Sequence, residues 1–337
     1  MRTPSARKLK HTMKLYPLKF NPIYKDKIWG GNKLKAILNK DYGSLPNCGE
    51  SWEISGVKGN VSVVREGPLK GKSLNELISE CKERLLGKKN WEKFGLEFPL
   101  LIKFLDAKED LSIQVHPDDK LAGERHNSKG KTEMWYIFQA DESATLITGF
   151  NKEVSEQEYL KHLNNKTLND ILNREKADEG DVFFIPAGRV HTIGKGICLA
   201  EIQQTSDITY RIYDFDRVDD KGHLRELHTQ QALAAIDYKH YDTYKTTYRD
   251  ELNRANNLVD CPYFTTNLIH GTAGVERDYS AWDSFVIYIN IMGTCILNYE
   301  GGTLEIVKGE TVLLPAELKK VSLTPKTEFK LLEVFIG

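Results

Sequence analysis

Short apolar or alternating runs, separated by turn residues, recur along most of this chain. The expected strands are Ser51–Ser55, Asn60–Val64, Leu100–Leu105, Leu111–Val115, Glu133–Gln139, Ala144–Thr148, Asp181–Ile185 and Cys198–Gln203. Gly, Pro, Asp and Asn residues punctuate these runs. Many short strands joined by such turns are typical of a β-barrel or a β-sandwich. The sequence therefore predicts a mainly β chain.

Helical patterns interrupt the strands at three places. The stretch Ser73–Leu86 begins with Ser-Leu-Asn-Glu, which is the signature of a capping box, and its apolar residues then recur at helical spacing. Similar patterns occupy Ser155–Leu163, continued by Thr167–Asn173, and Thr229–Ile236. We expect these helices to lie outside the strands, as insertions.

The chain also repeats itself weakly. The segment Gly309–Ala316 echoes Gly180–Ala187, and the strand Phe285–Ile291 echoes Met134–Phe138. An internal echo of this kind indicates two units with the same fold. We expect a larger unit with helical insertions over residues 14–240, and a smaller one over residues 258–337.

The smaller unit is predicted to bind no metal. In the echo, Lys320 aligns with His191, and no Gln-x-His or His-x-His pair precedes it. Its expected role is structural packing. The polar segment Asp237–Asn257, rich in Tyr and Lys, is expected to connect the two units.

Composition excludes several classes of protein. With 47 basic and 48 acidic residues, the formal charge is −1, which favours neither a nucleic-acid groove nor a membrane surface. Apolar residues make up 40% of the chain, and none of their runs approaches the ~18 residues of a spanning helix. The five cysteines are scattered and form no Cys-x-x-Cys pair, so we expect reduced thiols in a cytoplasmic protein. Residues 1–13 are basic and are expected to be a flexible tail, or to precede a true start at Met13.

Potential metal ligands occur in three separate stretches. Gln114 and His116 are two apart, so they share one face, together with Ser112, if the expected strand extends over Leu111–His116. Glu133 begins another expected strand, and His191 ends the segment that starts at Gly180. Two imidazoles, one carboxylate and one amide oxygen suit a borderline divalent metal such as zinc. A lone histidine is usually an ordinary surface or core residue, so no single one of these stretches predicts a metal site, and Gln-x-His alone is a very weak signal.

The spacing Gly, five residues, Pro, one residue, Gly, two residues, His resembles the second motif of the cupin barrels. From about Leu15 onward the chain resembles the type I phosphomannose isomerases, particularly their short bacterial form. The motifs that carry the resemblance are Trp29-Gly-Gly31, Gly49-Glu-Ser-Trp-Glu53, Gln114-Val-His-Pro-Asp118, Lys131-Thr-Glu133-Met-Trp-Tyr136, Pro186-Ala-Gly-Arg-Val-His191 and Glu201-Ile-Gln-Gln-Thr-Ser-Asp207-Ile-Thr-Tyr-Arg211.

This resemblance implies two cupin-like (jelly-roll) β-barrels with inserted helices. It also implies that one Zn²⁺, or another divalent transition metal, is bound by Gln114, His116, Glu133 and His191. The implied reaction interconverts mannose 6-phosphate and fructose 6-phosphate, by moving a proton between C2 and C1 through an enediol-type intermediate. The implied partner is a small phosphorylated sugar, and the chain is expected to be a monomer or a weak homo-oligomer.

Such a reaction needs a base, an electrophile near the sugar oxygens and a cationic clamp for phosphate. Arg211 is the best candidate for an active-site cation, although a surface ion pair with Asp214 or Asp216 would explain it equally well from spacing alone. Lys131 shares a face with Glu133 and can hold an oxyanion, unless it is a solvated turn lysine. Ser112 can bind phosphate or be an ordinary barrel hydroxyl.

The base is not decided by the sequence. Glu201, embedded in an apolar run, and Asp207, on the expected face of Arg211, are candidates, and a metal-bound water is a third. Asp118 is also expected to cap a short helix. Two rival functions remain open: a non-catalytic sugar-binding cupin regulator, and an iron-dependent cupin oxygenase, which the Gln ligand fits poorly.

Overall fold

The computed structural model describes residues 14–218 and 222–337. The tail or alternative start predicted for residues 1–13 lies outside this part of the chain. Strands dominate the described residues and confirm the mainly β prediction. Among the described helices, none is both long and apolar enough to cross a membrane.

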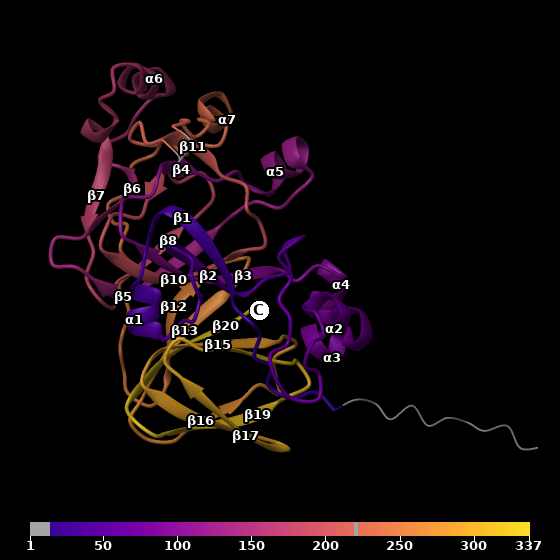
Figure 1. Ribbon diagram of the computed structural model, residues 1–337. Coiled ribbons are helices and arrows are strands. Elements are labelled where there is room, and N and C mark those ends of the chain that lie inside the picture. The colour runs from indigo at the N-terminus through magenta and orange to yellow at the C-terminus, as the bar shows by residue number, and fades with distance from the viewer. Residues whose placement is uncertain (1–13, 219–221) are drawn as a thin grey trace, which may run out of the picture.

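The strands form four antiparallel sheets, which Figure 1 shows stacked one above another. Sheet 1 has the order β1 (Ile23–Gly31), β2 (Cys48–Ile54), β3 (Leu100–Ala107), β10 (Ile197–Gln204), β5 (Glu133–Ala140) and β8 (Val182–Ile185). Sheet 2 has the order β11 (Tyr210–Tyr213), β4 (Ile113–Val115), β9 (His191–Thr192), β6 (Thr145–Phe150) and β7 (Leu172–Lys176). Sheet 3 has the order β12 (Ala255–Asp260), β13 (Thr265–Gly271), β20 (Phe329–Phe335), β15 (Val286–Met292) and β18 (Thr311–Leu314). Sheet 4 has the order β14 (Val275–Asp278), β19 (Lys320–Pro325), β16 (Thr294–Tyr299) and β17 (Gly302–Val307).

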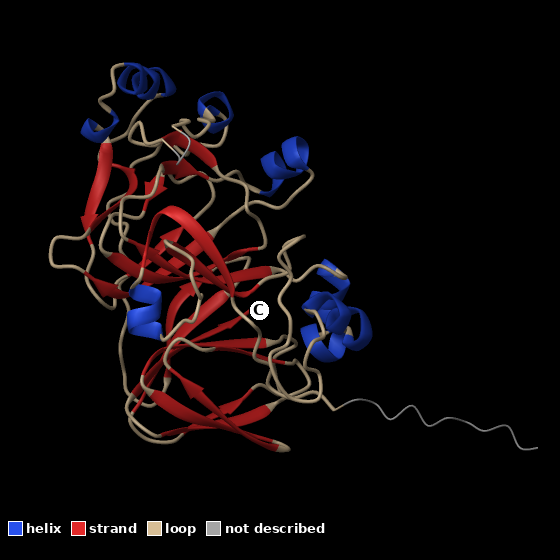
Figure 2. Cartoon of the chain, in the orientation of Figure 1, coloured by secondary structure: helices blue, strands red, loops and turns tan. Residues whose placement is uncertain are grey.

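The helices lie at the periphery of the stacked sheets, as Figure 2 shows and as the sequence predicts for insertions. They are α1 (Lys33–Leu38), α2 (Leu74–Cys81), α3 (Glu83–Leu86), α4 (Lys88–Phe94), α5 (Asp119–His126), α6 (Glu156–Asn164), the 3₁₀ helix η1 (Leu168–Asp170) and α7 (Thr229–Leu233). The predicted capping box at Ser73 is confirmed, because its side chain accepts from the Glu76 amide while the Glu76 carboxylate accepts from the Ser73 amide. The single helix predicted there is wrong, since Lys82 adopts a φ of 49° and separates α2 from α3.

Apolar side chains fill each gap between sheets. Sheets 1 and 2 pack face to face through residues such as Trp135 and Leu146, and form the first sandwich. Sheets 3 and 4 pack through Tyr288 and Leu297, and form the second sandwich. A third core cluster joins sheets 1 and 3, so the two sandwiches lie back to back.

Strand alternation decides which side chains enter the first sandwich. In β10, Cys198, Ala200 and Ile202 belong to the core shared with sheet 3, while Leu199 packs toward sheet 2. Glu201 therefore points into the first sandwich, because side chains in a strand alternate between the two faces. This alternation brings a buried carboxylate to the gap between sheets 1 and 2.

The two sandwiches share a topology, which confirms the predicted internal repeat. The order β3-β10-β5-β8 in sheet 1 corresponds to β13-β20-β15-β18 in sheet 3, and β4-β9-β6-β7 in sheet 2 corresponds to β14-β19-β16-β17 in sheet 4. Gly180 and Gly309 precede β8 and β18 with φ of 91° and 86°, a left-handed conformation that glycine adopts without strain.

Lys320, which the internal repeat aligns with His191, does not face the core of the second sandwich. In sheet 2, Gln114 pairs with His191, and in sheet 4 the inward-facing pair is Arg277 with Val321. Val321 is buried, whereas the Lys320 side chain is 77% exposed beside Asp278. The core-facing side chain beside Lys320 in the second sandwich is therefore apolar.

Three other local predictions need correction. The segment Asn60–Val64 forms isolated bridges from Val63 and Val64 and not a strand, and the helical pattern at Thr167–Asn173 yields only η1 before β7 begins. Strand β4 is shorter than predicted, so His116 lies just beyond its end. The patterns at Ser155–Leu163 and Thr229–Ile236 correspond to α6 and α7.

The division into units at residues 240 and 258 stays a prediction. Leu18, near the start of the described residues, forms a bridge with Leu313 in sheet 3, and Lys19 forms a partly buried ion pair with Glu310. The predicted connector runs along the edge of sheet 1, where the Thr246 amide donates to the Val182 carbonyl.

Candidate active site

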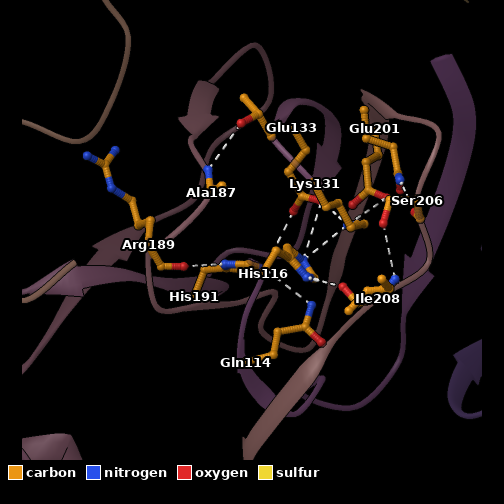
Figure 3. A network of polar contacts seen from close by, with 12 residues as sticks. Gln114, His116, Lys131, Glu133, Ala187, Arg189, His191, Glu201, Ser206 and Ile208 are labelled. Atoms are coloured by element: carbon orange, nitrogen blue, oxygen red, sulfur yellow. Dashed lines mark hydrogen bonds and ion pairs between the residues drawn. The ribbon is translucent and has the colours of Figure 1, made fainter. Parts of the chain in front are cut away.

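The four predicted metal ligands converge between sheets 1 and 2, as Figure 3 shows. Gln114 lies in β4 opposite His191 of β9, and His116 follows β4. Glu133 begins β5 on the facing sheet. Donor atoms of His116, Glu133 and His191 all lie within 4.8 Å of one another, and all three residues are buried. The fold thus brings together ligands from both layers of the first sandwich.

The histidine rings are oriented so that Nε2 faces Glu133. Nδ1 of His116 lies 2.9 Å from the Ile208 carbonyl, and Nδ1 of His191 lies 2.8 Å from the Arg189 carbonyl. A carbonyl only accepts, so each Nδ1 donates and each Nε2 retains its lone pair. The Nε2 atoms lie 3.6 and 3.5 Å from the Glu133 carboxylate oxygens. Backbone acceptors of this kind commonly orient metal-binding histidines.

Burial controls the protonation of these groups. It lowers the pKa of His191 to about 3 and that of His116 well below its usual value, so both rings are neutral. Burial, reinforced by Glu201, raises the pKa of Glu133 to about 7. The buried Oε1 of Glu133 has no hydrogen-bond partner among the described residues. Neutral imidazoles beside an unsatisfied buried carboxylate oxygen fit a divalent cation such as zinc.

Gln114 completes the donor set. Its amide nitrogen lies 3.2 Å from Nε2 of His191. Because the oxygen and nitrogen of a carboxamide are interchangeable by a flip, its oxygen can take the same position. The side chain therefore reaches the point where the other three donors meet.

Lys131 is buried beside this donor set, so the alternative of a solvated turn lysine is wrong. Its Nζ contacts Oε2 of Glu133, lies 3.1 Å from Nε2 of His116, and is 3.9 Å from Oε1 of Glu201. A lysine ammonium is a compact charge with three donors. Lys131 therefore links the ligand carboxylate to a second carboxylate.

Glu201 lies between two lysines in a buried row of charged side chains, Lys131, Glu201 and Lys103, which we call the charge row. Lys103, directly opposite on β3, lies 3.0 Å from its Oε1, and Trp135 donates to its Oε2 at 3.1 Å. Burial opposes ionisation of Glu201, but Lys103 and Lys131 outweigh it and lower its pKa to about 2. Glu201 is therefore an ionised carboxylate with both oxygens engaged.

The row continues onto β2 and β1 through residues that sequence reasoning missed. Glu50 lies 3.1 Å from Lys27, accepts from the Trp52 indole at 2.6 Å, and has its pKa lowered by Lys103 and Lys27 in spite of burial. The Lys103 ammonium lies 5.2 Å from the centre of a Trp52 ring, a distance at which cation–π attraction operates. A lone lysine within the apolar run Leu100–Leu105 was the available signal for Lys103.

The neighbouring motif residue Glu53 faces the other side of β2. It pairs with Lys40 at 2.7 Å and accepts from Ser51. Asp118 accepts from the Leu121 amide and caps α5, as predicted. These two carboxylates have structural partners outside the charge row.

The charge row borders a cavity of about 300 Å³, which we call the site cavity. This volume lies at the lower end of the range for small-molecule sites, about 300–1,000 Å³. Its polar lining comprises Lys27, Glu50, Lys103, Ser112, Gln114, Lys131, Glu201, Asp207, Thr209, Arg211 and Arg225. The structure thus gathers every predicted substrate-binding and catalytic residue around one space, with Gln114 joining it to the metal ligands.

Arg211 faces the site cavity and not a surface carboxylate. Asp214 is bonded to Arg217 and Arg225, and Asp216 pairs with Lys166. The guanidinium of Arg211 donates to the Glu226 carbonyl at 2.7 Å, and its buried Nε has no hydrogen-bond partner among the described residues. The alternative of an ion pair with Asp214 or Asp216 is therefore wrong.

Comparison with known proteins agrees with this geometry. The model of the phosphomannose isomerase type I catalytic domain matches residues 17–155, and that of the mannose-6-phosphate isomerase cupin domain matches residues 254–332. The chain is 38% identical to the putative mannose-6-phosphate isomerase YvyI of Bacillus subtilis, over 90% of this chain and 94% of the relative. It is 36% identical to the mannose-6-phosphate isomerase ManA of the same organism, over 91% and 95% of the two chains.

Solved structures show the same likeness. The crystal structure of the mannose 6-phosphate isomerase from Bacillus subtilis superposes with a TM-score of 0.85 at 35% identity, covering 94% of this chain and 99% of that one. The cupin-domain match confirms the expected cupin character of the second sandwich. On these matches, the chain belongs to the type I mannose-6-phosphate isomerase family.

Proposed function

We propose that this chain is a metal-dependent aldose–ketose isomerase that interconverts mannose 6-phosphate and fructose 6-phosphate. The observation that carries the proposal is the site cavity, where the charge row of Lys131, Glu201 and Lys103 meets a buried His116–Glu133–His191 cluster. The relatives that carry this activity in their names span nearly the whole chain.

The metal would be held by Gln114, His116, Glu133 and His191, whose donor set fits zinc or another borderline divalent cation. Bound there, such an ion would supply Lewis-acid polarisation of sugar oxygens. The rest of the site consists of the chain's own charged groups.

The reaction moves hydrogen only within the substrate. A base removes the proton from C2 of the aldose and returns it to C1, while the hydroxyl proton on O2 passes to O1. The enediol-type intermediate carries negative charge on oxygen. Lys131 and Lys103, both buried, are the ammonium groups beside Glu201 that can stabilise this charge.

Two carboxylates in the site cavity are proposed as the base. Glu201 is buried beside the metal ligands, but its pKa of about 2 makes it a weak base. Asp207 is exposed and lines the same cavity. We expect one of them to carry the proton, and Arg211 and Ser112 to bind the oxyanion or phosphate of the substrate.

The test is turnover by the purified protein with mannose 6-phosphate. Ketose phosphate should form at a rate in the ordinary enzyme range, roughly 1–1,000 per second. A chelator should abolish the activity, and zinc should restore it. Binding of the sugar phosphate without turnover would instead support the non-catalytic sugar-binding regulator.

We also infer that the protein acts in the cytoplasm. All five cysteines are unpaired thiols, and four of them are buried. Small buried thiols without disulfides are usual in a reducing compartment. Fractionation of cells that express the full chain would test this inference.

A further inference from the structure

Charge is distributed unevenly around the site cavity. On the side of sheet 1, each lysine has a glutamate neighbour: Lys103 lies 3.0 Å and Lys131 lies 3.9 Å from Glu201, and Lys27 lies 3.1 Å from Glu50. Such pairing largely neutralises this part of the wall. The remaining cationic side chains of the cavity, Arg211 and Arg225, lie in β11 and in the segment that follows it.

Two arginines share one carboxylate there. Asp214 is bonded by Nε of Arg225 at 2.7 Å and by Nη2 of Arg217 at 2.6 Å. Burial opposes ionisation of Asp214, but hydrogen bonds from these two guanidiniums hold its pKa below its usual range. One negative charge therefore serves two positive charges.

Arg211 adds a third guanidinium beside this group. Burial lowers the pKa of Arg211, and the charge of Arg225 lowers it further. Both Arg211 and Arg225 line the site cavity. Arg211 makes no ion pair with a carboxylate among the described residues, and Arg225 shares Asp214 with Arg217, so this side of the cavity has positive charge available for a ligand.

We propose that Arg225 is a phosphate-binding residue, which Asp214 orients and which acts with Arg211 to select phosphorylated sugars. A phosphate ester carries close to two negative charges at neutral pH, so more than one cationic side chain is needed to bind it. A guanidinium presents five donors, and the described hydrogen bonds of Arg225 use only the edge formed by Nε and Nη2. The planar fork suits phosphate oxygens. The identity of the sugar rests on the proposed function, whereas phosphate recognition does not.

Arg217 provides a matched control for Arg225. The two side chains bond the same carboxylate and are similarly exposed, at 22% and 24%. Arg217 also donates to the backbone carbonyls of Asp110 and Asp214, and so fastens the turn after β11. It is absent from the cavity lining formed by the described residues. A purely structural role for the arginine pair would make both variants behave alike.

The experiment compares Arg225→Gln and Arg217→Gln in the full-length, metal-loaded protein. Calorimetry gives the Kd for inorganic phosphate, and kinetics give kcat/KM for mannose 6-phosphate and for unphosphorylated mannose. Arg225→Gln should raise the Kd for phosphate roughly 10- to 100-fold, as expected on losing charge-assisted hydrogen bonds. It should lower kcat/KM for the phosphosugar alone. Arg217→Gln should change each value less than about threefold.

Equal effects of the two substitutions, or an unchanged Kd for phosphate in Arg225→Gln, would overturn the assignment. Circular dichroism and melting establish that each variant is folded. If Arg225→Gln does not fold, Arg225→Lys is tested in its place. A Kd for inorganic phosphate equal to that of wild type in Arg225→Lys would refute the proposal that the planar guanidinium binds phosphate. Phosphate binding that depends on Arg225, in a protein that does not isomerise the sugar, would refute the proposed function and leave the phosphate site standing.

Discussion

Replacing Arg277 with Met should destabilise the second sandwich and leave isomerase turnover intact. Glu333, which is 0% exposed, receives Nε and Nη2 of Arg277 at 2.8 and 2.9 Å. It also accepts from Tyr279 at 2.5 Å and from Asn267 at 2.8 Å. Removing the guanidinium leaves a buried carboxylate without its counter-ion.

Strand register explains why this pair exists. Glu333 lies opposite Tyr288 and Asn267, just as Glu201 lies opposite Trp135 and Lys103 in the first sandwich. Arg277, opposite Val321, occupies the position that Gln114 has opposite His191. We infer that a fixed guanidinium supplies the positive charge in the second sandwich, where the first has its proposed metal ligands.

The expected loss is about 3–5 kcal/mol, the usual cost of removing one partner from a buried ion pair. For a chain of this size, that corresponds to a fall in Tm of roughly 5–15 °C. The double variant Arg277→Met/Glu333→Gln should recover much of the loss, because no uncompensated charge remains buried.

Urea unfolding of the metal-loaded protein measures these differences. The control is Lys320→Met, since the Lys320–Asp278 pair is highly exposed and should contribute less than about 1 kcal/mol. A loss below about 1 kcal/mol in Arg277→Met, or a loss as large in Lys320→Met, would refute the reasoning. Turnover measured well below the Tm should stay within about twofold of wild type, because Arg277 lies in the second sandwich.

Three further predictions concern Glu201, Asp207 and Ser73. One of the variants Glu201→Gln and Asp207→Asn should remove the base and lower kcat by at least ~100-fold, while the amount of bound metal stays unchanged. Small effects on kcat in both variants would leave a metal-bound water as the candidate base. The pKa of Glu201 is lowered to about 2, so its contribution to stability is complete above its usual pKa near 4.5 and is lost as the pH falls toward 2. Between pH 5 and pH 2.5 the Tm of wild type should therefore fall further than that of Glu201→Gln, and parallel curves would contradict the ion-pair account. Ser73→Ala removes one half of the capping box and should cost about 1 kcal/mol in urea unfolding, whereas a neutral result would show that tertiary packing alone holds α2.

Local sequence patterns predicted most of the strands, and the residues proposed as metal ligands come together in the fold. The apolar runs of β5 and β10 are nearly continuous, because each strand packs one face on sheet 3 and the other on sheet 2. The two-residue spacing of Gln114 and His116, and the glycine-framed turn before His191, are local features. They could therefore be read without knowing which strands pair.

Lys103, Glu50 and Arg225 could not be assigned in the same way. Lys103 joins Glu201 only because β3 pairs with β10, almost a hundred residues later in the chain. Arg225 reaches the site cavity from the segment that follows β11. Partners of this kind depend on sheet order, which single-strand periodicity does not determine.

Two of the errors lie where tertiary packing overrides the local pattern. Neighbouring residues of a strand face opposite sides, so an alignment that is off by one residue exchanges a core-facing side chain for an exposed one. The sequence repeat selected the exposed Lys320, whereas the buried residue is its neighbour Val321. The break between α2 and α3 depends on a left-handed φ at Lys82, which the helical spacing of apolar residues does not encode. Tertiary packing, and not local propensity, decides both.

The central claim is that His116 and His191 bind the metal on which isomerisation depends. The most direct test is the metal content of purified wild type and of the double variant His116→Ala/His191→Ala, measured by elemental analysis after exhaustive dialysis. The account predicts one divalent metal per wild-type chain and less than about a tenth of that in the variant, since two of the four ligands are gone. An unchanged metal content in the double variant would contradict it.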